Sequence, residues 1–235
     1  MNGENAFRWC ALALACWLVG ASAAKASEAS LVGFAGGGNG VYSVKVKSLQ
    51  QVRFATTVHQ QMDWSCGSAA VATLLTYNYG HPVTEHEVLR AMFVHGNRAK
   101  IRREGFSLLD IKRFLESIGY QANGFETSLD KLAQARVPAI VMISDNGYNH
   151  FVVVKGIRNG NVLVGDPARG ARVIPRDEFQ KLWRNRIVFV VTNKRDKASF
   201  NDAADWRYMA APLGEAVSRE SLGSMLLFRP GPNDF

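Results

Sequence analysis

Residues 59–75 read HQQMDWSCGSAAVATLL, and in this stretch the chain changes from irregular polar sequence to a helical pattern. From Ser65 onward, apolar residues recur three and four positions apart, and Gly80 supplies a stop signal. Ser65 is the expected N-cap, which places Cys66 at the first helical position. Helix N-termini lower the pKa of a thiol, so Cys66 is a candidate nucleophile, and Gly67 leaves room for an approaching carbonyl. A buried, inert cysteine is the alternative.

The chain around this stretch divides into a helical half and a stranded half. Two capping-box pairs, Thr84 with Glu87 and Ser107 with Asp110, predict two further helices ending near residues 95 and 119. The predicted strands are 41–46, 52–58, 139–143, 151–154, 162–164 and 187–192, with short helices at 128–135 and 176–183. Turn sequences after 143 and 157 indicate an antiparallel meander. This order of elements favours an α+β fold.

A histidine and an aspartate stand at the ends of two of these predicted strands. His150 precedes the run FVVV, and Asp166 ends the run VLVGD sixteen residues later. In an antiparallel pair, the start of one strand lies beside the end of the next, so both side chains are expected at one edge of the sheet. The carboxylate can then orient the imidazole and stabilise its charged form. Taken singly, His150 also fits an ordinary loop histidine, and Asp166, which precedes a proline, fits a turn residue.

Acyl transfer also needs hydrogen-bond donors for the developing oxyanion. Gln60 and Gln61 lie just before Cys66, and the side-chain amide of either residue can act together with the Cys66 backbone N–H. The other histidines are His59, His81, His86 and His95, which lie before the cysteine or in and beside a predicted helix. Surface positions are expected for histidines on such a helix. The ordered set of Gln, Cys-Gly, strand His and strand Asp therefore predicts nucleophilic catalysis by a thiol.

The composition is that of a globular protein with excess positive charge. The 235 residues are 47% hydrophobic and 20% charged, which excludes a disordered chain. Twenty-eight Lys and Arg against 20 Asp and Glu give a net charge of +8, densest in the segment RAKIRR at 98–103. No nucleic-acid-binding motif accompanies this charge. We expect a solvated basic face, and no nucleic acid as a partner.

The first 26 residues have the pattern of a secretory signal peptide. Arg8 precedes an apolar run at 9–23, and small residues suited to cleavage follow. The run is shorter than the roughly 20 residues that a spanning helix needs, so the mature protein is expected to have no transmembrane domain. An uncleaved anchor is the alternative. Cleavage removes Cys10 and Cys16 and leaves Cys66 without a partner for an internal disulfide.

Taken with YNHFVVVKG at 148–156 and VLVGDP at 162–167, the opening stretch resembles the peptidase C39 family of papain-like cysteine peptidases. The resemblance implies a helical half that carries Cys66, packed on an antiparallel sheet that carries His150 and Asp166. It favours Gln60 over Gln61 as the oxyanion residue, because the family's glutamine stands six residues before its cysteine. It also implies cleavage after small residues such as Gly or Ala, with no cofactor and no metal. The family's usual acidic residue before the cysteine is Ser65 here, and we expect this to change the substrate groove locally.

The expected protein is an exported, periplasmic cysteine endopeptidase that processes a secreted protein or peptide. No transporter or ATPase sequence follows, and standalone members of this kind resemble the peptidase components of export or functional-amyloid (Fap-type) secretion systems. A catalytically silent substrate-docking module is the alternative, and transpeptidation by the same site stays open. The predicted organisation is 1–26 signal peptide, 27–51 flexible lead-in, 52–193 peptidase domain and 194–235 C-terminal extension. The apolar and aromatic residues of that extension, Trp206, Tyr208, Leu226, Leu227 and Phe228, are expected to pack on the domain.

Overall fold

The structure is a computed structural model that describes residues 28–31, 42–45, 47–145 and 147–209. Contacts divide the chain into two units, residues 1–47 and 48–235. In the first unit, β1 (Glu28–Leu31) pairs with β2 (Tyr42–Lys45) in an antiparallel ladder, which confirms the predicted strand at 41–46 over its described part. The predicted signal peptide lies outside the described residues. In the part of the chain that the structure describes, no helix is both long and apolar enough to cross a membrane.

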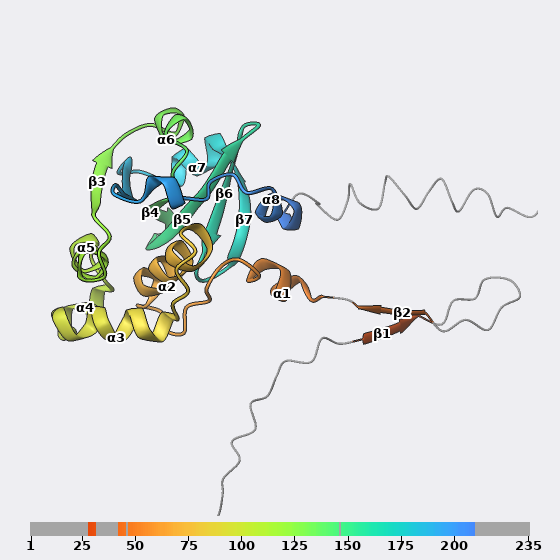
Figure 1. Cartoon of the computed structure of the whole chain (residues 1–235), viewed down its shortest axis with the longest axis horizontal. Helices are drawn as coiled ribbons and strands as arrows, with labels where there is room; N and C mark the ends of the chain where they lie inside the picture. Colours follow the sequence, from red (N-terminus) through yellow and green to blue (C-terminus); the bar gives the residue numbers. More distant parts are fainter. Residues whose placement is uncertain (1–27, 32–41, 46, 146, 210–235) are drawn as a thin grey trace, which may run out of the picture. The chain divides into compact units, whose positions relative to one another are not determined.

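The second unit is built around a six-stranded antiparallel sheet with the strand order β3-β8-β4-β5-β6-β7. Its strands are β3 (Ala122–Glu126), β4 (Ala139–Asp145), β5 (Tyr148–Arg158), β6 (Asn161–Asp166), β7 (Gly170–Pro175) and β8 (Ile187–Val191). Strands β4, β5 and β6 form the predicted meander (Figure 1). Strand β8 returns to pair with β4. The predicted α+β fold is confirmed.

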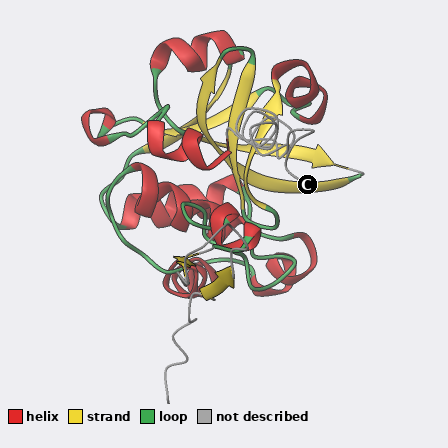
Figure 2. Ribbon diagram, turned by 90° about the vertical axis from the view of Figure 1, so that its right-hand side faces the viewer, coloured by secondary structure: helices red, strands yellow, loops and turns green. Residues whose placement is uncertain are grey.

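Helices lie on both sides of this sheet (Figure 2). They are α1 (Leu49–Arg53), α2 (Cys66–Thr73) with a π-helical continuation (Leu74–Asn78), α3 (Glu85–His95), α4 (Arg98–Glu104), α5 (Leu108–Ser117), α6 (Leu129–Ala135), α7 (Arg176–Leu182) and α8 (Ala203–Met209). The capping boxes predicted at Thr84 and Ser107 are both present, with Glu87 and Asp110 as their partners. These caps explain why α3 and α5 begin where the sequence predicts.

Alternating strand residues build two separate hydrophobic cores. On one face of the sheet, Ile140, Phe151, Val153, Phe189 and Val191 pack with residues of α2, α3 and α5. On the other face, Val141, Val152, Val154, Val188 and Val190 pack with residues of α6 and α7. Because a strand directs successive side chains to opposite faces, strands buried on both faces carry continuous apolar runs, such as residues 151–154 of β5. All eight residues of helix α2 are buried, including the polar Ser68 and Thr73, whose hydroxyls form hydrogen bonds.

Some local predictions are wrong. Residues 52–58 form the end of α1 and a turn, not a strand, because Ser48 and Gln51 make a capping box that starts the helix at Leu49. The strands β3 and β7 and the helix α4 are additional to the predicted elements. Both strands lie at the edges of the sheet, where the apolar pattern of a buried strand is weaker.

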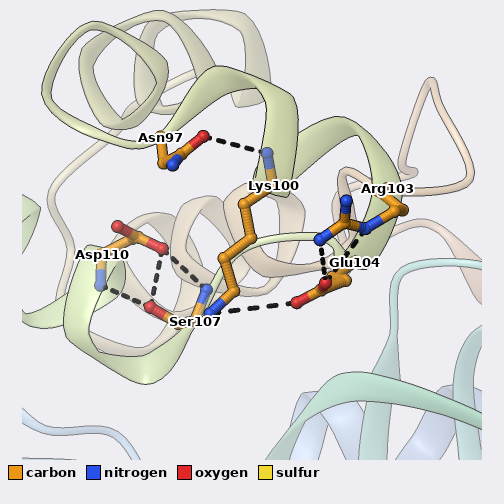
Figure 3. Close-up of polar contacts among 6 residues, drawn as sticks. All are labelled: Asn97, Lys100, Arg103, Glu104, Ser107 and Asp110. Atoms are coloured by element: carbon orange, nitrogen blue, oxygen red, sulfur yellow. Dashed lines mark hydrogen bonds and ion pairs between the residues drawn. The ribbon is translucent and has the colours of Figure 1, made fainter.

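The basic segment at 98–103 forms most of α4 (Figure 3). Asn97 caps this helix by accepting a hydrogen bond from the Lys100 N–H at 3.1 Å. Glu104 offsets part of the charge, with a carboxylate oxygen 2.6 Å from Arg103 Nη2 and the other 3.9 Å from Lys100 Nζ. All four charged side chains at 98, 100, 102 and 103 are exposed, as a solvated basic face requires.

The described part of the C-terminal extension packs on the sheet. Trp206 of α8 is 4% exposed, which confirms the packing expected for this residue. Its Asp205 neighbour forms an ion pair with Lys155, at 2.8 Å. A Cβ at Gly156 would collide with Asn201 and Trp206, so the glycine permits this close approach. The side chains of Tyr208, Leu226, Leu227 and Phe228 lie outside the described residues.

Candidate active site

Cys66 is the first residue of α2, as predicted, and is 6% exposed. Burial raises the pKa of the Cys66 thiol, and the backbone N–H groups of Phe151, Gly67 and Cys66 itself act against this increase. The negative charge of Asp166 raises the pKa further. The helix N-terminus therefore lowers the pKa in the expected direction, but burial outweighs it. The contact with Phe151 places the sulfur beside the strand residue that follows His150.

His150 and Asp166 lie together as the meander predicts. His150 Nε2 is 3.2 Å from Asp166 Oδ2, and both side chains are buried. The second ring nitrogen of His150, Nδ1, is buried and has no hydrogen-bond partner among the described residues. The carboxylate therefore fixes the ring through one nitrogen and leaves the other available for a proton.

Asp166 is itself held from several directions. Its Oδ1 accepts hydrogen bonds from the backbone N–H groups of Ala168, at 2.9 Å, and Arg169, at 3.2 Å. The guanidinium of Arg172 on β7 lies 3.1 Å from Oδ2. Burial alone raises the pKa of Asp166, but His150, Arg172 and the Ala168 N–H together lower it below its ordinary value. The arrangement favours an ionised carboxylate next to the imidazole.

Gln60 lies in the turn before α2 and is tied to the loop that carries Asp166. Its backbone N–H donates to the carbonyl of Pro167, at 3.0 Å. Its side-chain Nε2 donates to the Met62 carbonyl, at 3.0 Å. An amide nitrogen carries two hydrogens, so one N–H of Gln60 remains for another acceptor. Gln61 makes a different contact: its side chain is exposed, and its backbone N–H donates to Glu85.

Tyr148 connects the start of β5 with the turn before Cys66. Its hydroxyl donates to the carbonyl of Asp63, at 2.6 Å. Its ring is stacked on the imidazole of His150, with the ring centroids 5.8 Å apart. Burial raises the pKa of the Tyr148 hydroxyl, and the negative charges of Cys66 and Asp63 raise it further. The sequence did not single out Tyr148, since its partner lies 85 residues away.

Ser65 occupies the N-cap position of α2, but its side chain does not cap the helix. The hydroxyl instead has two acceptors for its one hydrogen, Glu85 Oε1 of α3 at 2.5 Å and the Met62 carbonyl at 3.0 Å, and it accepts from the Met62 N–H, at 3.2 Å. Ser65 is fully buried, so it lines no surface groove. The expectation that Ser65 alters the substrate groove is not supported by this placement.

Gly67 allows close packing inside the protein. This corrects the prediction that it leaves room for an approaching carbonyl. A Cβ on Gly67 would lie 2.9 Å from the Cβ of Phe106, a residue that is 4% exposed. The missing side chain therefore lets α2 approach the segment before α5.

Three other histidines have described side chains. His59 and His86 are exposed, and His81 Nδ1 lies 3.2 Å from the hydroxyl of Tyr120. Among the described residues, no group of three or more His, Cys, Asp or Glu side chains is placed to hold a metal ion.

A buried thiol at a helix start, beside a strand that carries a histidine paired with an aspartate, is the architecture of a cysteine peptidase. The model of the Peptidase C39 family matches residues 55–195. The chain belongs to the Peptidase C39 family, and it is a cysteine peptidase.

Two curated relatives share most of their length with this chain. A Pseudomonas aeruginosa protein named "Probable functional amyloid protease FapD" is 42% identical over 166 residues, covering 70% of this chain and 73% of the relative. A Pseudomonas fluorescens protein of the same name is 41% identical over 163 residues, covering 69% and 72%. Among solved structures, a double glycine motif protease from an AMS/PCAT transporter, in complex with the leader peptide, is 26% identical. The match covers 57% of this chain and 89% of the solved chain, with a TM-score of 0.48.

Proposed function

We propose that this protein is an exported endopeptidase that processes a secreted protein of a functional-amyloid export system, cutting after small residues. The observation that carries the catalytic part is the state of the His150 ring. One nitrogen is bound to Asp166, the other is buried and without a partner, and the next residue along the strand contacts the sulfur of Cys66. The similarity to two proteins named as functional amyloid proteases supports the substrate class.

The proposed reaction begins with proton transfer from the Cys66 thiol to His150 Nδ1. The thiolate attacks the scissile carbonyl carbon, and the carbonyl electron pair moves to the oxygen. The free amide N–H of Gln60 and the backbone N–H of Cys66 hold the resulting oxyanion. Collapse of this intermediate expels the amine, which takes the proton from the imidazolium and leaves a thioester on Cys66.

Water completes the cycle by the same route. His150 takes a proton from a water molecule, which attacks the thioester carbonyl, and the second intermediate releases the carboxylic acid and restores the thiol. Asp166 orients the ring throughout and stabilises its charged form. A free amine that replaced water would give a new amide instead of an acid, which is transpeptidation.

The test is cleavage of peptides that carry Gly-Gly or Ala-Ala at their centre, followed by mass spectrometry of the products. Wild-type protein should give a product ending in a free carboxylate, and Cys66→Ala should give none. Binding of such peptides without any cleavage would favour the docking-module alternative. A product with a new amide bond would indicate transpeptidation.

Export to the periplasm is part of the proposal and has its own test. Expression of the full chain with a C-terminal tag in a Gram-negative host should give a periplasmic protein whose N-terminus lies near residue 27. A protein that stays at its full length in the membrane fraction would indicate an uncleaved anchor.

A further inference from the structure

A buried carboxylate lies beneath the turn that connects Gln60 with Cys66. Glu85 is the first residue of α3 and is 4% exposed, although a glutamate is rarely buried without a specific partner. It takes no part in the capping box of this helix, which is made by Thr84 and Glu87. The proposed reaction does not use it either.

The Glu85 side chain accepts two hydrogen bonds, one from each end of this turn. Oε1 accepts from the hydroxyl of Ser65 at 2.5 Å and from the backbone N–H of Gln61 at 3.3 Å. The bond from Ser65 has the length of a charge-assisted O–H···O⁻ bond. The other oxygen, Oε2, is buried and has no partner among the described residues. The carboxylate is therefore anchored to the turn through Oε1 alone.

The two residues that Glu85 holds are the immediate neighbours of the two proposed oxyanion donors. Gln61 follows Gln60, whose amide carries one donor, and Ser65 precedes Cys66, whose backbone N–H is the other. A shift in either contact moves one donor relative to the other. Oxyanion donors must lie about 2.7–3.1 Å from the position that the oxygen takes in the transition state, so small displacements matter.

We propose that Glu85 is a positioning residue of the oxyanion site, which sets the separation between the Gln60 amide and the Cys66 N–H from a different helix. This inference rests on the proposed function. The side chain of Glu85 bonds to Gln61 and Ser65 and not to the sulfur of Cys66, so its loss should affect stabilisation of the oxyanion more than formation of the thiolate.

Two probes separate these effects. A peptide aldehyde ending in Gly-Gly forms a hemithioacetal with Cys66, and the oxygen of this adduct occupies the oxyanion site. Iodoacetamide alkylates the same sulfur by displacement of iodide at a saturated carbon and needs no oxyanion site. Affinity for the aldehyde and kcat/KM for a cleaved peptide therefore report the oxyanion site, whereas the alkylation rate against pH reports the thiolate and His150.

Glu85→Ala should weaken aldehyde binding and lower kcat/KM by about tenfold or more, given that loss of a whole oxyanion donor costs about 10²–10³ in rate. The alkylation profile should stay within about twofold of wild type. Glu85→Gln keeps an acceptor oxygen for Ser65 and should recover part of the loss. Ser65→Ala removes the shorter bond to Glu85, together with the contacts of the hydroxyl to the Met62 backbone, and leaves the carboxylate. It should reproduce part of the defect and serves if Glu85→Ala does not fold.

Glu87→Ala is the matched control, because it removes the other glutamate from the first turn of α3 and makes no contact with the turn before Cys66. It should lower stability and leave aldehyde binding unchanged. The inference is wrong if Glu85→Ala and Ser65→Ala bind the aldehyde like wild type, or if alkylation falls as much as aldehyde binding. Wild-type protein that is alkylated but never binds the aldehyde would overturn the proposed function, and this inference with it.

Discussion

His150 Nε2 and Asp166 Oδ2 lie 3.2 Å apart, and the geometry of one hairpin brings them together. Strands β5 and β6 are joined by the turn at Asn159 and Gly160, both with positive φ, and the ladder runs from this turn to the pair Val153 and Gly165. The start of β5 and the end of β6 therefore meet at the far end of the hairpin. Pairing with β4 and β7 holds the backbones of the two residues, since His150 lies opposite Ile143 and Asp166 opposite Gly170.

Asp166→Asn should lower peptide turnover by about 10²- to 10⁴-fold, because an amide does not stabilise the imidazolium and permits the wrong tautomer. Steady-state cleavage of a Gly-Gly peptide measures the loss, and circular dichroism checks that the fold is retained. Asp145→Asn is the control, since this carboxylate also pairs with Arg169 and Arg172 but does not touch His150. Equal losses in the two variants would show that the effect comes from the arginines.

Asp166 should also contribute to the pH dependence of stability. Its folded pKa is lowered, whereas an unfolded aspartate titrates near pH 3.9, so the unfolded state binds protons first as the pH falls. The stabilisation is complete above about pH 3.9 and is lost as the pH falls through the lower folded value. Urea unfolding from pH 6 to pH 2.5 should show the difference in unfolding free energy between wild type and Asp166→Asn narrowing at the acid end. A constant difference would contradict the lowered pKa.

The alkylation profile of Cys66 should depend on His150 in a specific direction. Burial raises the pKa of the thiol, so only a proton acceptor beside it can supply thiolate at neutral pH. The proposed proton transfer to His150 acts against this increase, so we expect iodoacetamide to modify wild-type protein below the free-thiol value of about 8.5, whereas His150→Ala, which lacks this acceptor, should react only above that value. His86→Ala, at an exposed helical position, is the control. Identical profiles for wild type and His150→Ala would remove the basis for a thiolate–imidazolium pair.

Tyr148 should act through both of its contacts. Tyr148→Phe keeps the stacking on His150 and loses the hydrogen bond to the Asp63 carbonyl, worth about 0.5–1.5 kcal/mol, so kcat/KM should fall by about 2- to 10-fold. Tyr148→Ala loses both contacts, so its kcat/KM should fall further. Tyr77→Phe, at another partly exposed tyrosine, is the control. If Tyr148→Phe and Tyr148→Ala had the same kcat/KM, the whole effect would come from the hydrogen bond.

Short-range signals predicted most of the elements that position the site. The capping boxes at Thr84 and Ser107 fixed the starts of two helices, and the turn sequences of the meander brought His150 and Asp166 to one edge. Such signals depend on residues a few positions apart, so they can be recognised without knowledge of the tertiary structure.

Contacts between distant segments could not be predicted in this way. Glu85 reaches Ser65 across 20 residues, and Tyr148 reaches Asp63 across 85. Glu85 belongs to no motif, and a glutamate in the first turn is expected to interact favourably with the helix dipole. Tyr148 lies in the segment YNHFVVVKG, but nothing in that segment indicates a contact with Asp63. Gly67 was misread for the same reason, because Phe106, which excludes a side chain there, comes from another part of the chain.

The ion pair between Lys155 and Asp205 gives the C-terminal segment a measurable role in stability. Lys155 is 1% exposed, and its Nζ also donates to the Thr56 carbonyl at 2.9 Å, so it ties α8 and the segment after α1 to β5. Asp205→Ala leaves a buried ammonium without its counter-ion and should lower the unfolding free energy by about 3–5 kcal/mol. Asp196→Ala, at an exposed position of the same segment, should have little effect.

The size of this loss should depend on pH and on the partner residue. Burial lowers the pKa of Lys155, and Asp205 partly restores it, so removal of Asp205 lowers the pKa further. At a pH between the folded pKa of Lys155 and its unfolded value of about 10.4, Lys155 is protonated in the unfolded state and neutral in the folded state. The unfolding free energy therefore rises with pH in this range. The loss of unfolding free energy in Asp205→Ala, measured by urea unfolding, should therefore shrink from pH 7 to pH 10.

Lys155→Met added to Asp205→Ala should recover much of the lost unfolding free energy at pH 7, because it removes the unpaired charge and keeps the side-chain volume. If the double variant is no more stable than Asp205→Ala, the destabilisation comes from lost packing of α8, not from the buried charge.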